Sequence, residues 1–243
     1  MSDFPQILGV YSLQLEAELG TGGTQSTHAN VTYWYARQLG EDRFEVQPLN
    51  AQHVPSGVRS ELKAMDFLKQ YTPEPSYYRI HTVPALKSLA RKIEMGTKAF
   101  AEGKLDEAEN QFIKALMIDD KSVEANYGLG EVYSETKEFD KLRGVLETLL
   151  GLSEAFTYVH RQRFNQFGIS LRKNGHYDES IRYYEKSLEI VDEDENVYFN
   201  LARVYFEKGM NDRCITNLQQ ALSLNPEFIE AQKFLKYCQK RAA

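Results

Sequence analysis

Five histidines and two cysteines are the residues of this sequence best suited to metal binding or nucleophilic chemistry. The histidines are His28, His53, His81, His160 and His176. No two of them have a spacing typical of a metal site, such as HxxxH or HxxE. Cys214 and Cys238 are 24 residues apart, far from the CxxC spacing of a zinc or redox motif. We therefore expect surface or core histidines, and two reduced thiols packed as small hydrophobic side chains.

Two other stretches invite a chemical interpretation. Residues 20–27 are rich in Gly and Thr, but they lack the Gly-Lys-Ser/Thr ending of a phosphate-binding loop, so we interpret them as a flexible linker. The acidic run at 192–195 contains the carboxylates of a calcium loop, but acidic residues are also favoured at helix N-termini, and we expect that role. The sequence has no GxSxG, GxGxxG or DxDxDG motif. It predicts no catalytic residue, no metal and no cofactor, and hence a non-enzyme.

The composition is that of an ordinary folded protein. Of 243 residues, 42% are hydrophobic and 26% are charged, which excludes wholesale disorder. The net charge of −6 and the pI near 5.5 disfavour general binding to a phosphate backbone. The sequence has no apolar run of 18 residues, so we expect no membrane span. Because the first residues do not resemble a secretory signal, we expect a cytoplasmic protein.

A short phrase recurs four times and divides the second part of the chain into repeats. The phrase occupies Gly103–Asp106, Lys137–Asp140, Gly175–Asp178 and Gly209–Asp212, at steps of 34, 38 and 34 residues. A small residue lies seven positions before each phrase: Gly96, Gly130, Gly168 and Ala202. Such self-similarity at a fixed period is typical of solenoid proteins.

The phrase predicts two helices joined by a tight turn. Its glycine can adopt the left-handed conformation that ends a helix. Its aspartate can accept hydrogen bonds from the free amides that open the next helix. The small residues before it let the two paired helices approach closely.

These residues resemble the tetratricopeptide repeat, which has a period of 34 and the signature W-x2-L-G-x2-Y, A-x3-F, P. The last repeat matches through Tyr198, Leu201, Ala202, Tyr205, Cys214, Leu218, Ala221 and Pro226. The resemblance covers residues 84–241. It implies a mostly α fold, in which a helical solenoid of four helix hairpins starts near residues 89, 123, 161 and 195. We expect this domain to span 84–243 and to end in a capping helix over 227–241, with a polar outer side.

The step of 38 residues adds about one helical turn between the second and third repeats. Ser153 followed by Glu154 is typical of a helix start. We therefore predict that the first helix of the third repeat begins near Glu154 rather than Arg161. Phe156 and Val159 would then pack on the second repeat.

Residues 1–83 have no such period, and we assign them to no family. Val31–Gln38 and Arg43–Leu49 flank a turn at residues 39–42 and predict a β-hairpin. Ser60–Tyr71 predicts one amphipathic helix, and Pro84 predicts the start of a long helix. A hairpin and a short helix bury little surface, so we expect this segment to depend on the repeats or on a partner.

The resemblance implies binding of a peptide or helix of another protein in the concave face of the solenoid. We therefore expect an adaptor or assembly chaperone. The carboxylate clamp of heat-shock-type relatives would require Lys, Asn and Arg where this sequence has Ile93, Thr97, Gly128, Gln162 and Gln166. Recognition of a chaperone's acidic tail is therefore disfavoured.

The family pattern also assigns the residues that would line the groove, on the first helix of each repeat. They are Tyr127, Glu131, Gln162, Asn165, Gln166, Arg172, Asn196, Phe199, Asn200, Arg203 and Phe206, with Lys233 and Tyr237 of the capping helix. Amides can pair with a peptide backbone, and arginines can bind a carboxylate. Alternatively, these amides bond neighbouring helices and line a solvated groove.

Two other functions stay open. A single-stranded nucleic acid could bind residues 33–43, with its bases stacked on Tyr33, Trp34 and Tyr35 and its phosphates neutralised by Arg37 and Arg43. Adjacent strand residues face opposite sides of a sheet, however, and the sequence has no basic stripe there. The chain could also self-associate through an exposed strand edge near residues 43–49.

Overall fold

The computed structural model describes residues 5–19, 26–191 and 193–242, which form two compact units. The first unit contains the residues up to Glu94 together with Lys114–Lys121. The second contains Met95–Ile113 and the residues from Ser122 onward. Helices α3 (Val83–Ala101) and α4 (Leu105–Leu116) therefore contribute to both units.

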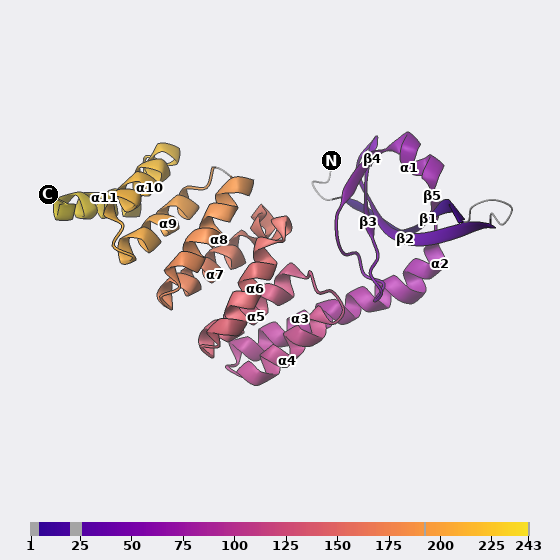
Figure 1. Ribbon diagram of the computed structural model, residues 1–243, viewed down its shortest axis with the longest axis horizontal. Coiled ribbons are helices and arrows are strands. Elements are labelled where there is room, and N and C mark those ends of the chain that lie inside the picture. Colours follow the sequence, from indigo (N-terminus) through magenta and orange to yellow (C-terminus); the bar gives the residue numbers. More distant parts are fainter. Residues whose placement is uncertain (1–4, 20–25, 192, 243) are drawn as a thin grey trace. The chain divides into compact units, whose positions relative to one another are not determined.

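The first unit is built around a five-stranded antiparallel sheet. Its strands are β1 (Gln6–Leu19), β2 (Ser26–Gly40), β3 (Arg43–Pro48), β4 (Ser60–Lys63) and β5 (Tyr71–Pro73). Their order in space is β4-β3-β2-β1-β5 (Figure 1). The predicted hairpin is confirmed as the β2–β3 pair. Of the predicted linker at 20–27, residues 20–25 lie outside the described residues, whereas Ser26 and Thr27 belong to β2 and pair with β1.

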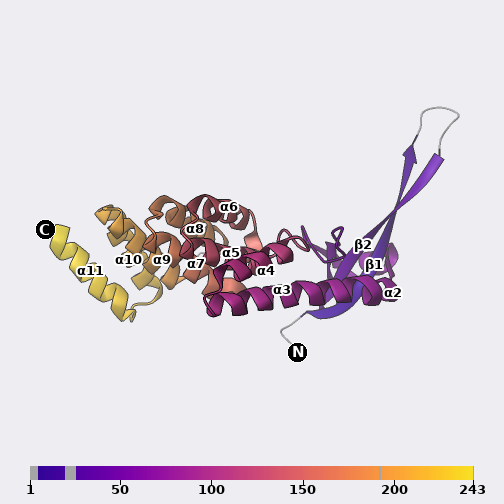
Figure 2. The same ribbon diagram turned by 90° about the horizontal axis from the view of Figure 1, so that it is seen from below.

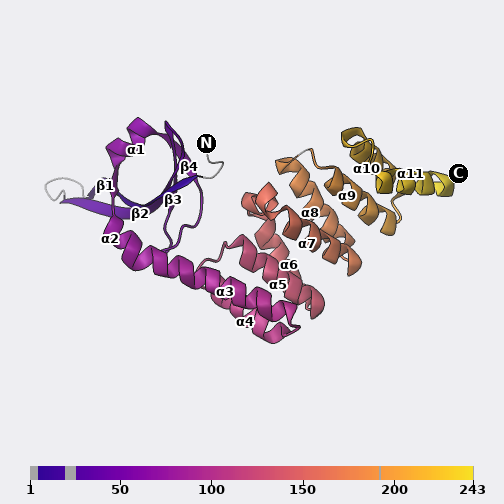
Figure 3. The ribbon, with the colours of Figure 1, turned by 180° about the vertical axis from the view of Figure 1, so that it is seen from behind.

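The sheet curls because a short helix connects its two edge strands. Helix α1 (Ala64–Gln70) runs directly from β4 to β5. Its seven residues span about 10 Å, whereas the outer strands of a flat five-stranded sheet would lie about 19 Å apart. Figure 3 shows the strands curving into a partial barrel, with α1 on its open side.

Phe67 of α1 fills the inside of this curl. Its ring stacks on Phe44 with 4.7 Å between centroids, and it lies 4.8 Å from Tyr11 and 5.3 Å from Tyr71. Phe67 is fully buried in the same cluster as Val46. One aromatic side chain thus holds strands from both ends of the sheet.

Two predictions about the strands of this unit are wrong. Ser60–Lys63 is not the first turn of a helix but strand β4, because pairing with β3 overrides the local helical pattern. As a result only Phe67 of the predicted apolar face is buried, and Met65 stays 83% exposed. Since β4 covers β3 over residues 43–46, the predicted free edge near residues 43–49 is also not an edge.

A helical stretch runs without interruption from Pro75 to Ala101, through α2 (Pro75–Tyr77), a π-helical turn η1 (Tyr78–Thr82) and α3. The predicted helix start at Pro84 is wrong, since Pro75 occupies the first helical position instead. Pro84 has no amide hydrogen to donate to the carbonyl group of residue 80, so a regular α-helical ladder is interrupted there. The π-helical turn ends at Thr82, two residues before Pro84, and accommodates this interruption.

The sheet unit includes residues that are distant in the sequence. Asn50 Nδ2 donates a hydrogen bond to the carbonyl oxygen of Ile118 at 2.8 Å. Ser56 Oγ donates to Asp119 Oδ1 at 2.9 Å. Residues 114–121 therefore belong to the packing of the first unit and not only to the first repeat.

The second unit is a stack of helix pairs, as the sequence predicts. After α4 follow α5 (Val123–Glu135), α6 (Phe139–Leu150), α7 (Arg161–Lys173), α8 (Tyr177–Ile190), α9 (Glu195–Glu207), α10 (Asn211–Leu224) and the capping helix α11 (Ile229–Ala242). Figure 1 shows the pairs following one another along the chain. In α11, Ala231 and Cys238 are buried, whereas Gln232, Lys236 and Lys240 are exposed.

The turn inside each pair follows the predicted glycine geometry. Gly103, Gly175 and Gly209 have φ between 73° and 80°, and Lys137 takes the same conformation at 60°. The predicted aspartate caps are wrong for α6, α8 and α10, whose N-cap residues make no side-chain capping bond. The aspartates lie inside the first turn instead, where a negative charge still favours the helix dipole.

Glycines on the first helices receive aromatic rings from neighbouring helices. A Cβ atom built on Gly96 would lie 2.8 Å from the ring of Phe112, and one on Gly128 would lie 2.3 Å from the same ring. Phe112 of α4 is thus wedged between its own repeat and the next. A methyl group at either glycine would overlap with the ring.

Further along the stack the same contact recurs. A Cβ atom on Gly130 would lie 2.4 Å from Phe167, and one on Gly168 would lie 2.4 Å from Tyr184. Ser180 Oγ also donates to the carbonyl oxygen of Gly168 at 3.0 Å. The predicted close approach of the paired helices therefore rests on ring-to-backbone packing.

The four extra residues between the second and third repeats do not extend α7. The connection between α6 and α7 instead contains two 3-10 turns, η2 (Ser153–Phe156) and η3 (Tyr158–His160), and α7 begins at Arg161. The predicted helix start near Glu154 is wrong, because Thr157 adopts an extended conformation that separates the turns. Phe156 is buried, but its ring contacts are with Phe164 and Tyr183 of the third repeat rather than with the second repeat. Val159 is 84% exposed and does not pack on the second repeat.

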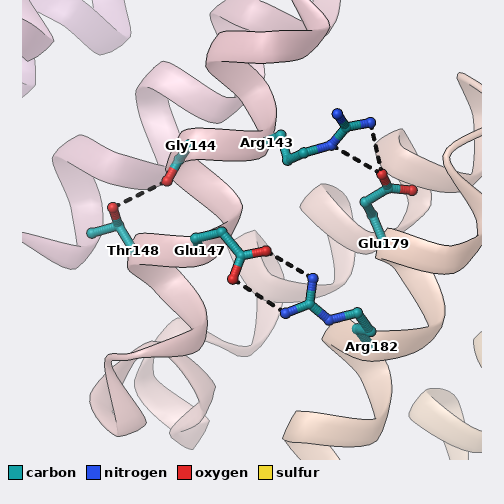
Figure 4. A network of polar contacts seen from close by, with 6 residues as sticks. All are labelled: Arg143, Gly144, Glu147, Thr148, Glu179 and Arg182. Atoms are coloured by element: carbon teal, nitrogen blue, oxygen red, sulfur yellow. Dashed lines mark hydrogen bonds and ion pairs between the residues drawn. The ribbon is translucent and has the colours of Figure 1, made fainter.

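Ion pairs join the second helices of successive repeats. Arg143 lies 3.1 Å from Glu179, and Arg182 lies 2.7 Å from Glu147 (Figure 4). The hydrogen bond from Arg182 lowers the pKa of the Glu147 carboxyl group. Three of these four side chains are more than half exposed, and only Glu179 is partly buried, so each pair contributes little to stability. Most of the stability of the repeats therefore comes from burial of apolar side chains and from ring packing.

We predict opposite effects for alanine at two glycines of the second unit. Gly128→Ala should lower the free energy of unfolding by about 1–3 kcal/mol, because the new methyl group overlaps with Phe112. Gly144→Ala is the matched control in α6, where a Cβ atom has open space, and it should raise stability by roughly 0.5–1 kcal/mol. Urea titrations followed by circular dichroism measure both. Equal effects of the two substitutions would contradict the wedge.

A second prediction concerns the independence of the two units. Residues 1–82 alone should unfold without a cooperative transition, since they lack Ile118, Asp119 and the helix after Thr82. Residues 83–243 should unfold cooperatively. Thermal melts of the two fragments test this, and a sigmoidal transition of the 1–82 fragment would contradict it.

Candidate partner-binding groove

The predicted groove residues lie on α5, α7, α9 and α11. Helix α5 packs on α7 and α7 packs on α9, so the first helices of consecutive repeats lie side by side. Ring contacts from Phe199 and Phe206 of α9 to Phe234 join α11 to this row. The candidate site is the face that these helices share.

Tyr127 is not on a free surface of this face. Its ring is fully buried, and its hydroxyl donates to the carbonyl oxygen of Ala155 at 2.8 Å. It also shares a hydrogen bond of 2.6 Å with the Tyr183 hydroxyl. Burial raises the pKa of Tyr127 well above its usual range, so the hydroxyl stays protonated. The turn η2, which the 38-residue step provides, therefore covers this position.

Glu131 of α5 lies deeper than a surface carboxylate. The side chain is half-buried, and burial raises the pKa of its carboxyl group, while the positive charge of Arg163 opposes this shift. Arg163 donates a hydrogen bond of 3.2 Å to the carbonyl oxygen of Glu124. Glu131 is therefore a partly desolvated carboxyl group next to the positive charge of Arg163.

The amides of the face fall into two groups. Gln162 and Gln166 of α7 are exposed. Asn200 is buried and donates to Asn165 Oδ1 at 3.3 Å, which joins α9 to α7. For the Asn165–Asn200 pair, the structure therefore shows helix-to-helix bonding. Asn196 is half-buried near the start of α9 and donates to Glu195 Oε1 at 3.2 Å.

The two arginines have different environments. Arg172 is buried and forms an ion pair with Glu207 of α9. Arg203 is half-buried, and its guanidinium lies 6.0 Å from the centroid of the Phe199 ring. Burial and the neighbouring Arg172 lower the pKa of Arg203, while Glu207 opposes the shift. Sequence reasoning missed Glu207, although it lies four residues after Arg203 on the same helix.

Aromatic rings continue the face toward the end of the chain. Phe206 lies 5.2 Å from Phe234 and 5.8 Å from Tyr237, between ring centroids. Tyr237 is 53% exposed, and Lys233 beside it is also exposed. Sequence reasoning missed Phe234, because the spacing of α11 assigns its buried face to Phe228, Ala231, Leu235 and Cys238.

Residues that could do chemistry are held in unreactive settings. Cys214 and Cys238 are buried free thiols with their sulfur atoms 3.6 Å apart. Burial raises the pKa of the Cys214 thiol to about 12, which disfavours the thiolate.

Asp194 accepts hydrogen bonds from the backbone amides of Asn196 and Val197, so the acidic run provides a helix cap. Asp192 lies outside the described residues. Within the described ranges, no group of three or more His, Cys, Asp or Glu side chains could hold a metal ion.

The aromatic residues of β2 do not gather on one surface. Tyr33 stacks on Tyr77 at 3.9 Å, whereas Tyr35 is buried. Trp34 packs edge-on against Tyr71 at 6.0 Å. Arg37 pairs with Glu45 at 2.6 Å. The groups predicted to bind a nucleic acid are thus engaged in contacts within the sheet unit.

The fold and the inner face define a helical-repeat protein. A family model described as tetratricopeptide repeat matches residues 99–154 and 171–236, about half of the chain. The chain therefore belongs to the tetratricopeptide repeat family. The match begins at residue 99 and does not reach the strands of the sheet unit.

Known proteins share the repeats but not the whole chain. The photosystem I assembly protein Ycf3 of Prochlorococcus marinus (strain NATL2A) is 32% identical over 78 residues. This alignment covers 30% of the chain and 41% of the relative, so the chain spans less than half the length of Ycf3.

Solved structures agree on the fold of the repeats. PilF of Pseudomonas aeruginosa has a TM-score of 0.51 at 18% identity, covering 65% of this chain and 71% of PilF. A structure of MamA of Desulfovibrio magneticus RS-1 that starts at its residue 41 has a TM-score of 0.50 at 18% identity, covering 64% of this chain and 85% of that chain. In the described part of this chain, none of the helices has the length and apolar character needed to cross a bilayer.

The raised pKa of Glu131 predicts a pH effect on stability. A carboxyl group with a raised pKa binds more protons in the folded state, so stability falls as the pH rises from the ordinary value of 4.5 through the raised value. Glu131→Gln should therefore be more stable than the unmodified protein at about pH 7.5 and similar at about pH 4. Urea midpoints at the two pH values measure this, with the exposed Glu135→Gln of the same helix as control. If Glu131→Gln changed the free energy of unfolding equally at both pH values, the raised pKa of Glu131 would be contradicted.

Proposed function

We propose that this protein is a non-catalytic adaptor or assembly factor that binds a segment of another protein on the inner face of its repeats. Membership of the repeat family and the likeness to the assembly protein Ycf3 support this class of function. The available surface lies on α7, α9 and α11, because η2 covers the earlier part at Tyr127.

Arg203 is the observation that carries the proposal. Its guanidinium is partly desolvated and is repelled by the neighbouring Arg172, while Glu207, which forms an ion pair with Arg172, attracts it only at longer range. Among the described residues, no carboxylate forms an ion pair with Arg203. A partner's carboxylate would offset this desolvation and repulsion, and charge-assisted hydrogen bonds to arginine are strong.

The aromatic residues that follow Arg203 on this face indicate what would flank that carboxylate, since Phe206 lies three residues after Arg203 on α9. Phe206 and Tyr237 lie edge to face, and Tyr237 is partly open to solvent. Aromatic residues next to an arginine are typical of the anchoring centre of a protein interface. We therefore expect a partner segment with an acidic residue beside an apolar one.

Photo-crosslinking tests the location of the surface. A benzophenone amino acid at position 237, in cells of the source organism, should capture a defined partner. The same group at position 159 is the control, because Val159 is exposed on the turn η3. Capture from position 159 alone would place the partner elsewhere.

A quantitative prediction then uses the purified partner. Arg203→Ala should weaken its binding by about 2 kcal/mol, as expected for an anchor residue, and should leave the melting temperature nearly unchanged. Arg143→Ala on α6 is the matched control and should bind normally. Titration calorimetry measures both affinities, and undiminished binding by a folded Arg203→Ala protein would contradict the proposed role of this face.

A further inference from the structure

Part of strand β2 has a neighbour on one side only. It pairs with β1 from Ser26 to Gln38, but its pairing with β3 begins only at Trp34. After Leu49 the chain turns away, with a hydrogen bond from Asn50 N to Val54 O. Figure 2 shows β1 and β2 continuing together beyond the rest of the sheet. Among the described residues, no strand covers this edge of β2 over residues 26–32.

The backbone groups that face this edge can be identified. The carbonyl oxygen of Tyr33 accepts a hydrogen bond from Leu49 N at 2.9 Å, so Tyr33 faces the β3 side. Because backbone groups alternate sides along an antiparallel strand, Val31 faces the same side. Its N–H and C=O groups therefore point to the open edge, and the Val31 side chain is 40% exposed.

A pocket of about 360 Å³ lies where this open edge meets the paired part of the strand. It is lined by four consecutive residues of β2 (31–34), by residues 48–51, and by His53 and Tyr77. Side chains of consecutive strand residues point to opposite faces of a sheet. A pocket that all four line therefore opens at the strand edge, in line with the free backbone groups.

The polar groups around the pocket are used within the protein. His53 Nδ1 and the Tyr77 hydroxyl are hydrogen-bonded at 2.8 Å. Trp34 Nε1 donates to Thr32 Oγ1 at 2.9 Å. No charged side chain lines the pocket, so aromatic surfaces and apolar groups remain for an incoming side chain.

We propose that the open edge of β2 binds an extended, uncharged segment of a partner protein as an added strand, with an apolar side chain of that segment in the pocket. Strand addition supplies main-chain hydrogen bonds, and a pocket beside the edge supplies selectivity. The sequence of residues 26–32 contains no Asp, Glu, Lys or Arg, whereas β1 beyond its pairing with β5 carries Glu16 and Glu18. A neutral partner strand therefore suits β2 and not the opposite edge.

A second copy of this chain fits the site less well. Antiparallel self-pairing over residues 26–32 would bring the partner's residues before Ser26 toward the pocket. Those residues are Gly20–Gln25, which contain only Gly, Thr and Gln and offer no large apolar side chain. A different protein accounts for both the edge and the pocket.

The test selects binders from a library of random linear peptides displayed on phage, with the full-length protein as bait. Val31→Pro removes one edge N–H group that the sheet does not use, so the fold should persist. Val31→Thr is the matched control, because it keeps the N–H group and β-branching. Selected peptides should bind the protein and Val31→Thr, should bind Val31→Pro about tenfold more weakly, and should shift the fluorescence of Trp34, the single tryptophan.

A second measurement does not depend on the folding of the variant. N-methylation at alternate positions of a selected peptide should abolish binding in one register and spare it in the other, because only every second amide faces the strand. Binding that ignores both N-methylation registers, or no peptide enriched above the Val31→Pro bait, would overturn the proposal. So would a dimer, seen by light scattering, that Val31→Pro dissociates.

Discussion

The repeat unit depends on a steric constraint. An aromatic ring on one helix must lie against the backbone of another helix, at a glycine position where no side chain is in the way. Phe112 meets this condition at both Gly96 and Gly128, and Tyr184 meets it at Gly168. The rings set how closely each helix pair approaches the next. Further along the stack, polar contacts join α7 and α9, where Asn200 donates to Asn165 and Arg172 pairs with Glu207. The inner face is a product of this packing.

The short insertion between the second and third repeats divides that inner face into a covered part and an accessible part. On one side Tyr127 is sealed under η2 and bonded to Tyr183, and it contributes only to the core. On the other side Arg203, Phe206 and Tyr237 keep charge and ring surface available. The sheet unit adds a surface of another kind, in which backbone groups of β2 rather than side chains are free to pair. The two surfaces would recognise different properties of a partner, namely an acidic group with an apolar neighbour and an extended neutral strand.

Sequence reasoning succeeded where structure is determined locally. The helix pairs follow from a pattern that repeats within a few turns, and the left-handed glycines at 103, 175 and 209 could be read directly from the recurring phrase. It failed where contacts with residues distant in the sequence determine the local structure. Ser60–Lys63 has a helical pattern but becomes a strand because β3 is available to pair with it. Tyr127 has a groove position, but a turn about 28 residues later covers it, in keeping with its bond to Ala155. No pattern in the sequence announces Phe67 as the centre of the curled sheet, since Met65 and Leu68 are equally apolar.

The buried aromatic cluster at the third repeat has a consequence for how the stack comes apart. In a linear array, stability is a sum of terms for each repeat and for each junction with its neighbour. The junction around Tyr183 is unusually well coupled, because this ring contacts Phe156, Phe164, Phe167 and Tyr184 within about 6 Å and its hydroxyl is bonded to Tyr127 across the junction. The capping helix α11 lies at one end and has few buried residues. Partial opening would therefore begin at the terminal helices and halt at the centre, so amide protons there would be the last of the array to exchange with solvent.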